Sequence, residues 1–312
     1  MANMLKNRAK DPTHAVFGVT PEGEVFDRPL SSGPHWLICG QTGSGKSVFV
    51  NNLLISAMSH SHPDELQITW VDPKKVEAGP YVGLPFCPID PVTNMNDAYG
   101  LMAFYVDEME RRYGIMEEHG FKQVADMNAW IDDNPKDAKA KGLEKMPYML
   151  CVIDEYADLQ QQAPDTEKLI ARLGAKARAS AQHVICLTQR PSIQVISGLL
   201  KANLPSRVAL KVADGTNSQI IMDETGAEKL RGYGDAFVKE VSGEITRMQG
   251  PFIPDDQLHA IFKQLREKYP KPESIDYKQR AVDSGMCEWE EAYEDDVPWK
   301  DRHVKPVKQK RR

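Results

Sequence analysis

The stretch Gly40-Gln41-Thr42-Gly43-Ser44-Gly45-Lys46-Ser47 matches the phosphate-binding pattern G-x-x-x-x-G-K-[ST] at every fixed position. Residues 35–39 before it form an apolar run that predicts a buried strand, and residues 48–58 after it predict a helix. Glycines let such a loop curl so that its N–H groups face a polyphosphate at the positive end of the helix dipole. The context predicts an α/β domain with a nucleoside-triphosphate site; the alternative is a glycine-rich turn that binds no nucleotide.

The loop and the first turn of its helix are the expected binding residues. Lys46 would reach the β- and γ-phosphates, and the Ser47 hydroxyl would contact Mg²⁺. The predicted nucleotide-contacting residues are Gly40, Gln41, Thr42, Gly43, Ser44, Gly45, Lys46, Ser47 and Val48.

The composition limits the other classes of function. The 312 residues could form two domains or one large α/β domain with appendages. No apolar stretch approaches the roughly 20 residues of a membrane span, and the N-terminus lacks the apolar core of a secretory signal. The five cysteines show no metal or redox spacing, so we expect them to be reduced and packed. These features predict a soluble cytoplasmic protein without a membrane segment.

The net charge of −6 argues against nucleic-acid binding, because most such domains present a basic face. Whole-chain charge is a weak guide, however, when the binding surface is small or lines a channel. The charge is also unevenly distributed: residues 288–296 are rich in carboxylates, and residues 302–312 are rich in Lys and Arg.

The order of apolar runs predicts three regions: an N-terminal extension with a hairpin over 1–30, the ATPase-type domain over 31–268, and a charged flexible tail over 269–312. Strands alternate with helices, which predicts a mainly parallel sheet covered on both faces, with ligands at the carboxyl ends of its strands. Residues 132–146 are charged and contain Pro135 and Gly142, which predicts a surface loop. The predicted strands are 66–71, 148–153, 183–188, 207–212, 236–239 and 245–248, and the predicted helices include 96–119, 167–179 and one that starts at 254–255.

A second motif ends the strand over 148–153, where four apolar residues precede Asp154 and Glu155. Asp154 would hold Mg²⁺ directly or through water. Glu155 would orient and deprotonate the water that attacks the γ-phosphate. An apolar strand end with two capping carboxylates is the alternative, but the upstream phosphate loop favours the catalytic interpretation.

Gln189 follows another apolar strand and could sense the γ-phosphate or the attacking water. An arginine from a neighbouring subunit commonly neutralises the charge that develops during phosphoryl transfer. The residue types leave this role open among Arg172, Arg178, Arg190 and Arg207, each of which is more often a surface residue.

Together these motifs resemble the motor domain of the FtsK/SpoIIIE family of double-stranded DNA translocases, within the FtsK–HerA superfamily. The similarity extends from about Gly33 to about Phe262. The matching segments are 40–47 (GQTGSGKS), 71–74 (VDPK), 94–97 (NMND), 108–113 (EMERRY), 153–159 (IDEYADL), 169–173 (LIARL), 176–179 (KARA), 188–191 (TQRP) and 197–207 (SGLLKANLPSR).

The resemblance implies a RecA-like fold, ATP and Mg²⁺ as cofactors, and a homohexameric ring that pumps duplex DNA through its channel. It implies catalytic roles for Lys46, Asp154, Glu155 and Gln189, with Ser47 and Asp154 as metal-holding residues. It also implies that Arg178 acts on the neighbouring subunit's site. Arg190 and Lys201 fall in the segment that touches DNA phosphates, although a solvated helix residue is the alternative for Lys201.

The chain also departs from the family pattern. Only about thirty residues precede the core, the tail is too short for a module that reads polarity sequences, and residues 213–218 lack a basic pore residue found in some relatives. We therefore expect a stripped-down motor. Alternatives are viral genome packaging, conjugative DNA transfer, a nucleotide-switched assembly protein, and an RNA or single-strand helicase.

Overall fold

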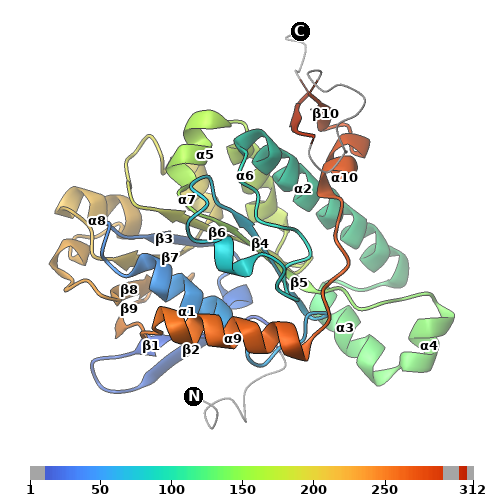
Figure 1. The fold of residues 1–312 in the computed structure, drawn as a ribbon, viewed down its shortest axis with the longest axis horizontal. Coiled ribbons are helices and arrows are strands. Elements are labelled where there is room, and N and C mark those ends of the chain that lie inside the picture. Colours follow the sequence, from blue (N-terminus) through green and yellow to red (C-terminus); the bar gives the residue numbers. More distant parts are fainter. Residues whose placement is uncertain (1–10, 291–301, 308–312) are drawn as a thin grey trace.

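The computed structural model describes residues 11–290 and 302–307. A nine-stranded sheet crosses the molecule, and helices cover both of its faces (Figure 1). The strand order is β2-β1-β9-β8-β7-β3-β6-β5-β4. The strands are β1 (His14–Val19), β2 (Val25–Pro29), β3 (Trp36–Cys39), β4 (Leu66–Val71), β5 (Tyr148–Ile153), β6 (Gln182–Thr188), β7 (Ser206–Leu210), β8 (Asp235–Lys239) and β9 (Ile245–Gln249).

The strands from β7 through β3, β6 and β5 to β4 are parallel, as the alternation of strands and helices predicted. They are buried on both faces, and successive side chains enter opposite cores. In β5, Leu150 and Val152 belong to one hydrophobic core, whereas Met149, Cys151 and Ile153 belong to the other. The predicted fold class, α/β and RecA-like, is confirmed.

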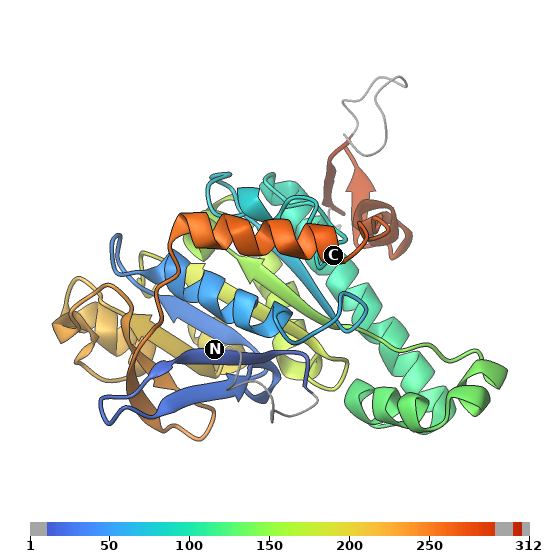
Figure 2. The ribbon, with the colours of Figure 1, turned by 60° about the horizontal axis from the view of Figure 1, so that its bottom comes forward.

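Helices fill the two cores from opposite sides (Figure 2). The helices α1 and α9 pack on one face of the sheet, and α2, α5, α6, α7 and α8 pack on the other. The helix bounds are α1 (Lys46–Met58), α2 (Met95–His119), α5 (Tyr156–Gln162), α6 (Thr166–Lys176), α7 (Gly198–Asn203), α8 (Gly215–Met222) and α9 (Asp255–Lys268).

The other half of the sheet is antiparallel, and short connections join two of its strand pairs, β1–β2 and β8–β9. Residues 240–244 link β8 to β9, with the Gly243 N–H donating to the Glu240 carbonyl at 2.9 Å. The predicted N-terminal hairpin is confirmed as β1 and β2, and Val19 of β1 pairs with Gln249 of β9. The hairpin therefore extends the main sheet rather than standing apart from it.

The loop predicted over residues 132–146 is wrong in part, since this segment contains the end of α3 (Val124–Asp133) and the whole of α4 (Pro135–Ala140). Pro135 occupies the first position of α4, where a missing N–H costs nothing. Leu143 and Met146 then return to the core. The proline and the charges suggested a breaker, but here the proline starts a helix.

The flexible tail predicted over residues 269–312 differs from the structure in its described part. There α10 (Tyr277–Asp283) and β11 (Val304–Pro306) pack on α2, and β10 (Cys287–Trp289) packs on α10 and pairs with β11. Val304 is fully buried, and a Cβ on Gly100 would lie 2.5 Å from its Cγ2. Asp97 also receives the Lys278 ammonium at 3.1 Å and the His303 ring at 2.6 Å. Most of the acidic stretch and the last basic residues lie outside the described residues.

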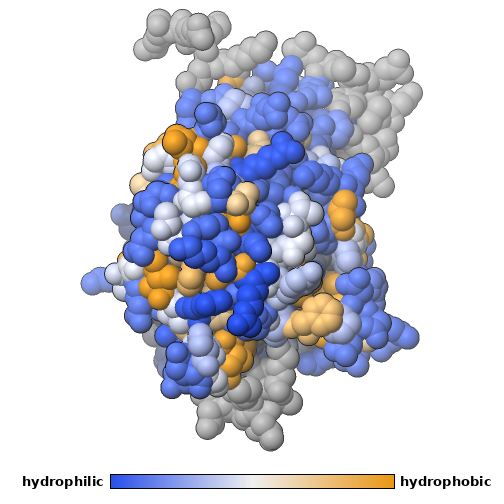
Figure 3. Space-filling model, turned by 90° about the vertical axis from the view of Figure 1, so that its left-hand side faces the viewer, coloured by the Kyte–Doolittle hydropathy of each residue, from blue (hydrophilic) through white to orange (hydrophobic). Residues whose placement is uncertain are grey.

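One face of the molecule shows how polar and apolar residues are distributed on the surface (Figure 3). The side nearest α8 is mainly hydrophilic, and its apolar residues are scattered (Figure 3). None of the helices in the described ranges has the length and apolar character to cross a lipid bilayer. All five cysteines are free and buried, which confirms their expected role in packing.

Candidate nucleotide-binding site

The predicted phosphate loop connects β3 to α1 at the carboxyl edge of the parallel strands. Its strand lies between β6 and β7, so that Cys39 is flanked by Thr188 and Ala209. The loop is fixed to both neighbours: the Gly40 N–H donates to Thr188 at 3.3 Å, and the Gln41 N–H donates to Lys211 at 2.9 Å. These bonds hold the loop above the middle of the sheet.

Two loop glycines adopt the left-handed conformation that favours glycine. Gly43 has φ +78° with open space where a Cβ would stand, and Gly45 has φ +93° at the N-cap of α1. A Cβ on Gly45 would lie 2.6 Å from the Gly234 nitrogen. The loop therefore needs glycine for its curl and for its close contact with the segment before β8. The first N–H groups of α1 have no partner within the helix, as an anion site requires.

The structure brings Lys46 and the strand-end carboxylates together. The Lys46 ammonium donates to Asp154 Oδ1 at 2.9 Å, and both side chains are buried. The Ser47 hydroxyl donates to Glu77 Oε1 at 2.6 Å. The lysine, the hydroxyl and the Asp154 carboxylate are residue types that suit a triphosphate with Mg²⁺.

Glu155 is held in one orientation beside Asp154. Its φ of +55° is unusual for a non-glycine residue and turns the chain sharply from β5 into α5. The Thr188 hydroxyl donates to its carboxylate at 2.8 Å, and the Gln189 N–H approaches at 3.3 Å. The side chain is only 4% exposed, so its orientation is set by these donors rather than by water.

Gln189 occupies a bridging position because β6 lies between the loop strand β3 and the Asp-Glu strand β5. Its backbone N–H faces Glu155, and its side-chain oxygen accepts from the Thr42 hydroxyl at 2.9 Å. One residue thus touches both the phosphate loop and the carboxylate pair. A sequence reading could name Gln189 but not this double contact.

Residues 72–77 complete the edge of the site, although no sequence motif had predicted a role for them there. Asp72 is fully buried and accepts the N–H groups of Lys74 and Glu77 at 3.0 and 2.9 Å. The Lys74 ammonium lies 3.9 Å from Glu155 Oε2 and 3.7 Å from Asp158 Oδ2. The available signal was the position of Asp72 directly after β4, the neighbour of β5.

Arg178 lies away from the phosphate loop of its own chain. It is exposed and follows α6, just before β6 begins at Gln182. The phosphate loop meets the opposite end of β6, next to Thr188. A strand of this length spans about 20 Å, at about 3.3 Å per residue. Arg172, another arginine of this region, pairs with Glu110 at 2.8 Å.

The two predicted DNA-contacting residues have different surroundings. Arg190 is exposed directly after Gln189. Lys201 on α7 is 24% exposed in its side chain, and its ammonium donates to Asp223 Oδ1 at 2.6 Å. Asp223 also receives Arg207 and Lys239, at 2.5 and 3.0 Å. Burial alone would raise the pKa of Asp223, but these three cations hold it well below its usual range.

Comparison with known proteins agrees with these motifs. The FtsK/SpoIIIE family model matches residues 2–193. DNA translocase FtsK of Streptococcus pneumoniae is 44% identical over 245 residues, which cover 78% of this chain and 32% of that protein. DNA translocase FtsK of Vibrio parahaemolyticus is 39% identical over 287 residues, covering 86% of this chain and 28% of that protein. The chain thus spans about a third or less of the length of these relatives.

Solved structures with similar folds are more distant in sequence. The cytoplasmic domain of the Thermomonospora curvata type VII secretion ATPase EccC superposes with a TM-score of 0.73 at 20% identity, over 87% of this chain and 33% of that one. The pCW3 conjugation coupling protein TcpA with ATPγS superposes with a TM-score of 0.70 at 24% identity, over 83% of this chain and 71% of that one. These likenesses support the fold. Since the family model matches more than half of the sequence, the chain belongs to the FtsK/SpoIIIE family.

Proposed function

We propose that this protein hydrolyses ATP to move along double-stranded DNA as a homohexameric ring. The observation that supports this most directly is the contact of Lys46 with Asp154, beside a Glu155 that is connected to the phosphate loop through Gln189. The relatives named DNA translocases support DNA as the substrate, and the duplex form is part of the proposal.

Different residues of the chain have different roles in the proposed phosphoryl transfer. Lys46 neutralises the β- and γ-phosphates, and Ser47 with Asp154 would hold Mg²⁺, which supplies positive charge at the phosphate oxygens. Glu155 orients a water molecule and accepts its proton. The Thr188 and Gln189 donors keep the Glu155 carboxylate in place, so the base is oriented before the nucleotide enters.

Gln189 is the proposed sensor because it contacts both the phosphate loop, at Thr42, and the proposed general base, Glu155. Loss of the γ-phosphate changes what Thr42 and its loop contact, and Gln189 passes that change to β6 and the segment after it. Arg190 is the next residue, so a shift at Gln189 moves a candidate DNA contact.

DNA contact is proposed through phosphates, because a motor must grip any sequence. Arg190 is exposed and can face such a phosphate, whereas the Lys201 ammonium forms an ion pair with the Asp223 carboxylate. A DNA phosphate would therefore compete with the Asp223 carboxylate for Lys201. Repeated around a ring, one Arg and one Lys per subunit give a positive lining in an acidic protein.

The test is the rate of ATP hydrolysis with and without duplex DNA, for the wild type and for Glu155→Gln. We expect strong stimulation by DNA in the wild type, and a loss of about 100-fold or more in the variant, which keeps ATP binding. Glu118→Gln, an exposed change on α2, is the matched control and keeps the wild-type rate.

Turnover that ignores DNA would contradict the motor and favour a protein whose nucleotide only switches assembly. DNA stimulation without displacement of a triplex-forming strand from the duplex would likewise contradict translocation. The wild type's mass with ATP and DNA, measured by light scattering, tests the hexamer separately.

A further inference from the structure

Two aromatic side chains remain unexplained by the roles above. Tyr233 is 87% exposed and Phe252 is 75% exposed, and within the described ranges no other Phe, Tyr or Trp is exposed. A tyrosine combines a large apolar ring with a polar hydroxyl and is enriched at contact surfaces. Both stand on segments that touch the phosphate loop or its helix.

The segment that carries Tyr233 is bonded to the phosphate loop. The Gly234 N–H donates to the Ser44 carbonyl at 2.9 Å. A Cβ placed on Gly45 would lie 2.6 Å from Gly234, and one placed on Gly232 would lie 3.9 Å from the Gly43 oxygen. Tyr233 therefore stands directly beside the place where a triphosphate would be held.

The backbone at Tyr233 is held in an unfavourable conformation. Gly232, Tyr233 and Gly234 have φ values of +89°, +53° and +90°, all in the left-handed region. A tyrosine is rare there, because its Cβ crowds the backbone. Such conformations persist where the surrounding structure fixes them, and they are concentrated at ligand sites.

Phe252 follows the neighbouring strand, β9 (Ile245–Gln249). The Gly250 N–H donates to the Gly234 carbonyl at 2.8 Å, which continues the β8–β9 ladder past its last pair. A Cβ on Gly250 would meet Phe49 of α1 at 2.8 Å. The two aromatic residues therefore leave adjacent strands at the end of the ladder, next to the start of α1.

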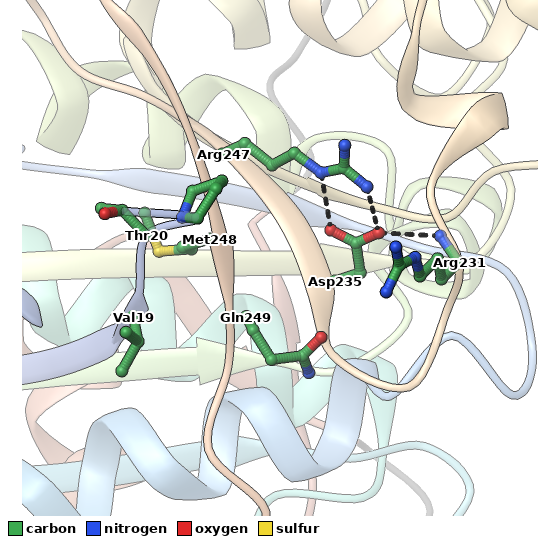
Figure 4. Close-up of a pocket in the computed structure, with 8 residues that line it drawn as sticks. Val19, Thr20, Arg231, Asp235, Arg247, Met248 and Gln249 are labelled. Carbon is green, nitrogen blue, oxygen red and sulfur yellow. Dashed lines mark hydrogen bonds and ion pairs between the residues drawn. The ribbon is translucent and has the colours of Figure 1, made fainter. Parts of the chain in front are cut away.

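An ion pair braces the loop that presents Tyr233 (Figure 4). Asp235 accepts both Nε and Nη2 of Arg247, at 3.1 and 2.8 Å, and also the Arg231 N–H at 2.9 Å. The Gln249 side chain donates to the Tyr233 carbonyl at 2.8 Å. These bonds fix both ends of residues 231–235, so the ring is displayed on a rigid support rather than on a loose loop.

We propose that Tyr233, assisted by Phe252, forms the stacking surface for the base of the bound nucleotide. The inference rests on the proposed function, since it needs a nucleoside triphosphate in the phosphate loop. The loop itself holds only phosphates, and a flat aromatic face beside it supplies the contact that a base requires. Tyr233 is then a binding residue that distinguishes a nucleotide from a bare polyphosphate.

The experiment compares the affinity of the full chain for MgATP and for magnesium tripolyphosphate by calorimetry. Tyr233→Asn removes the ring and keeps a residue that tolerates the left-handed backbone. We expect it to weaken MgATP binding about 5- to 100-fold while leaving tripolyphosphate binding unchanged. Tyr233→Phe should restore the MgATP affinity, and Val241→Ala, another exposed apolar residue on this hairpin, should not alter it.

If Tyr233→Asn weakens the affinity for both ligands equally, or for neither, the stacking role of Tyr233 is overturned. The proposed function is not affected by that result. A wild type that binds neither ligand would instead refute the proposed function. An independent check is photolabelling with 8-azido-ATP: labelled peptides from residues 231–252 support the inference, and labelling confined to other segments contradicts it.

Discussion

Two residues of the candidate site, the proposed general base Glu155 and the proposed stacking residue Tyr233, have backbone conformations that cost energy. Glu155 has φ +55° and Tyr233 has φ +53°, each worth about 1–3 kcal/mol of strain. The donors around Glu155 offset that cost by fixing its carboxylate. The position of the base thus depends on Thr188 of β6 as much as on the Asp-Glu motif itself.

Gly45→Ala should abolish ATP binding and destabilise the protein by about 1–3 kcal/mol, because the residue has φ +93° and no space for a Cβ. The new methyl group would push Gly234 away from the phosphate loop. Isothermal calorimetry with MgATP and thermal unfolding would measure both effects.

Gly114→Ala is the matched control, since Gly114 lies within α2 and has open space around its Cβ position. It should leave ATP binding intact and stabilise the helix by about 0.5–1 kcal/mol. Similar losses in the two variants would show that the curl of the phosphate loop is not what makes Gly45 necessary.

At the scale of elements, α2 is fastened to its neighbours by buried charge. Glu108 accepts from Arg111 and Arg112 at 2.8 Å, and from Arg280 of α10 at 2.9 Å. Arg112 also donates to the carbonyls of Pro147 and Ser180, before β5 and β6. One carboxylate therefore connects α2 to α10 and, through Arg112, to the amino ends of two core strands.

This cluster predicts an acid-sensitive stability. Burial alone raises the pKa of Glu108, but the hydrogen bonds and charges of Arg111 and Arg112 outweigh it and lower the pKa from 4.5 to about 2. A depressed pKa means that the stabilisation is complete above about pH 4.5 and is lost as the pH falls toward 2. Urea unfolding at pH 7 and at pH 3 should therefore give a lower free energy of unfolding at pH 3.

Glu108→Gln should lower the free energy of unfolding at pH 7 by about 3 kcal/mol, since Arg112 would stay buried without its charge partner. Its stability should also change less between pH 4.5 and pH 2 than that of the wild type. An unchanged acid dependence would assign the effect to other carboxylates. Glu118→Gln on the same helix should match the wild type.

At the scale of the whole molecule, different groups of predicted functional residues lie at the two ends of β6. The phosphate loop and Glu155 lie at its carboxyl end, and Arg178 precedes its amino end. An arginine so placed is far from its own site, which suits donation to a neighbour in a head-to-tail ring.

Mixing two inactive variants tests this arrangement. Arg178→Ala and Glu155→Gln should each lose DNA-stimulated hydrolysis, because each site needs one residue from each of two subunits. An equal mixture should regain about one quarter of the wild-type rate, the fraction of random neighbours that supply both intact residues. Arg172→Ala, the exposed arginine paired with Glu110, is the control and should stay active by itself. A mixture without activity would contradict donation between subunits.

The sequence predicted the parallel core well, because buried parallel strands are continuous apolar runs and the loop motif is local. The sequence also predicted that Lys46, Asp154 and Glu155 lie close together, because strand ends of a parallel sheet meet at one edge. The tail was mispredicted because its charged residues outnumber the few apolar ones, such as Val304, that dock on α2. In α4, Pro135 looked like a breaker but begins the helix.

The sequence by itself determined the phosphate-loop motif, the carboxylate pair and the family, since each is encoded by residues close together in the chain. Only the tertiary structure decided that Tyr233 stands beside that loop, that Lys201 shares Asp223, and that Arg178 lies near the far end of β6. These relations join residues far apart in sequence. They follow from strand order and register, which the local periodicity of side chains does not specify.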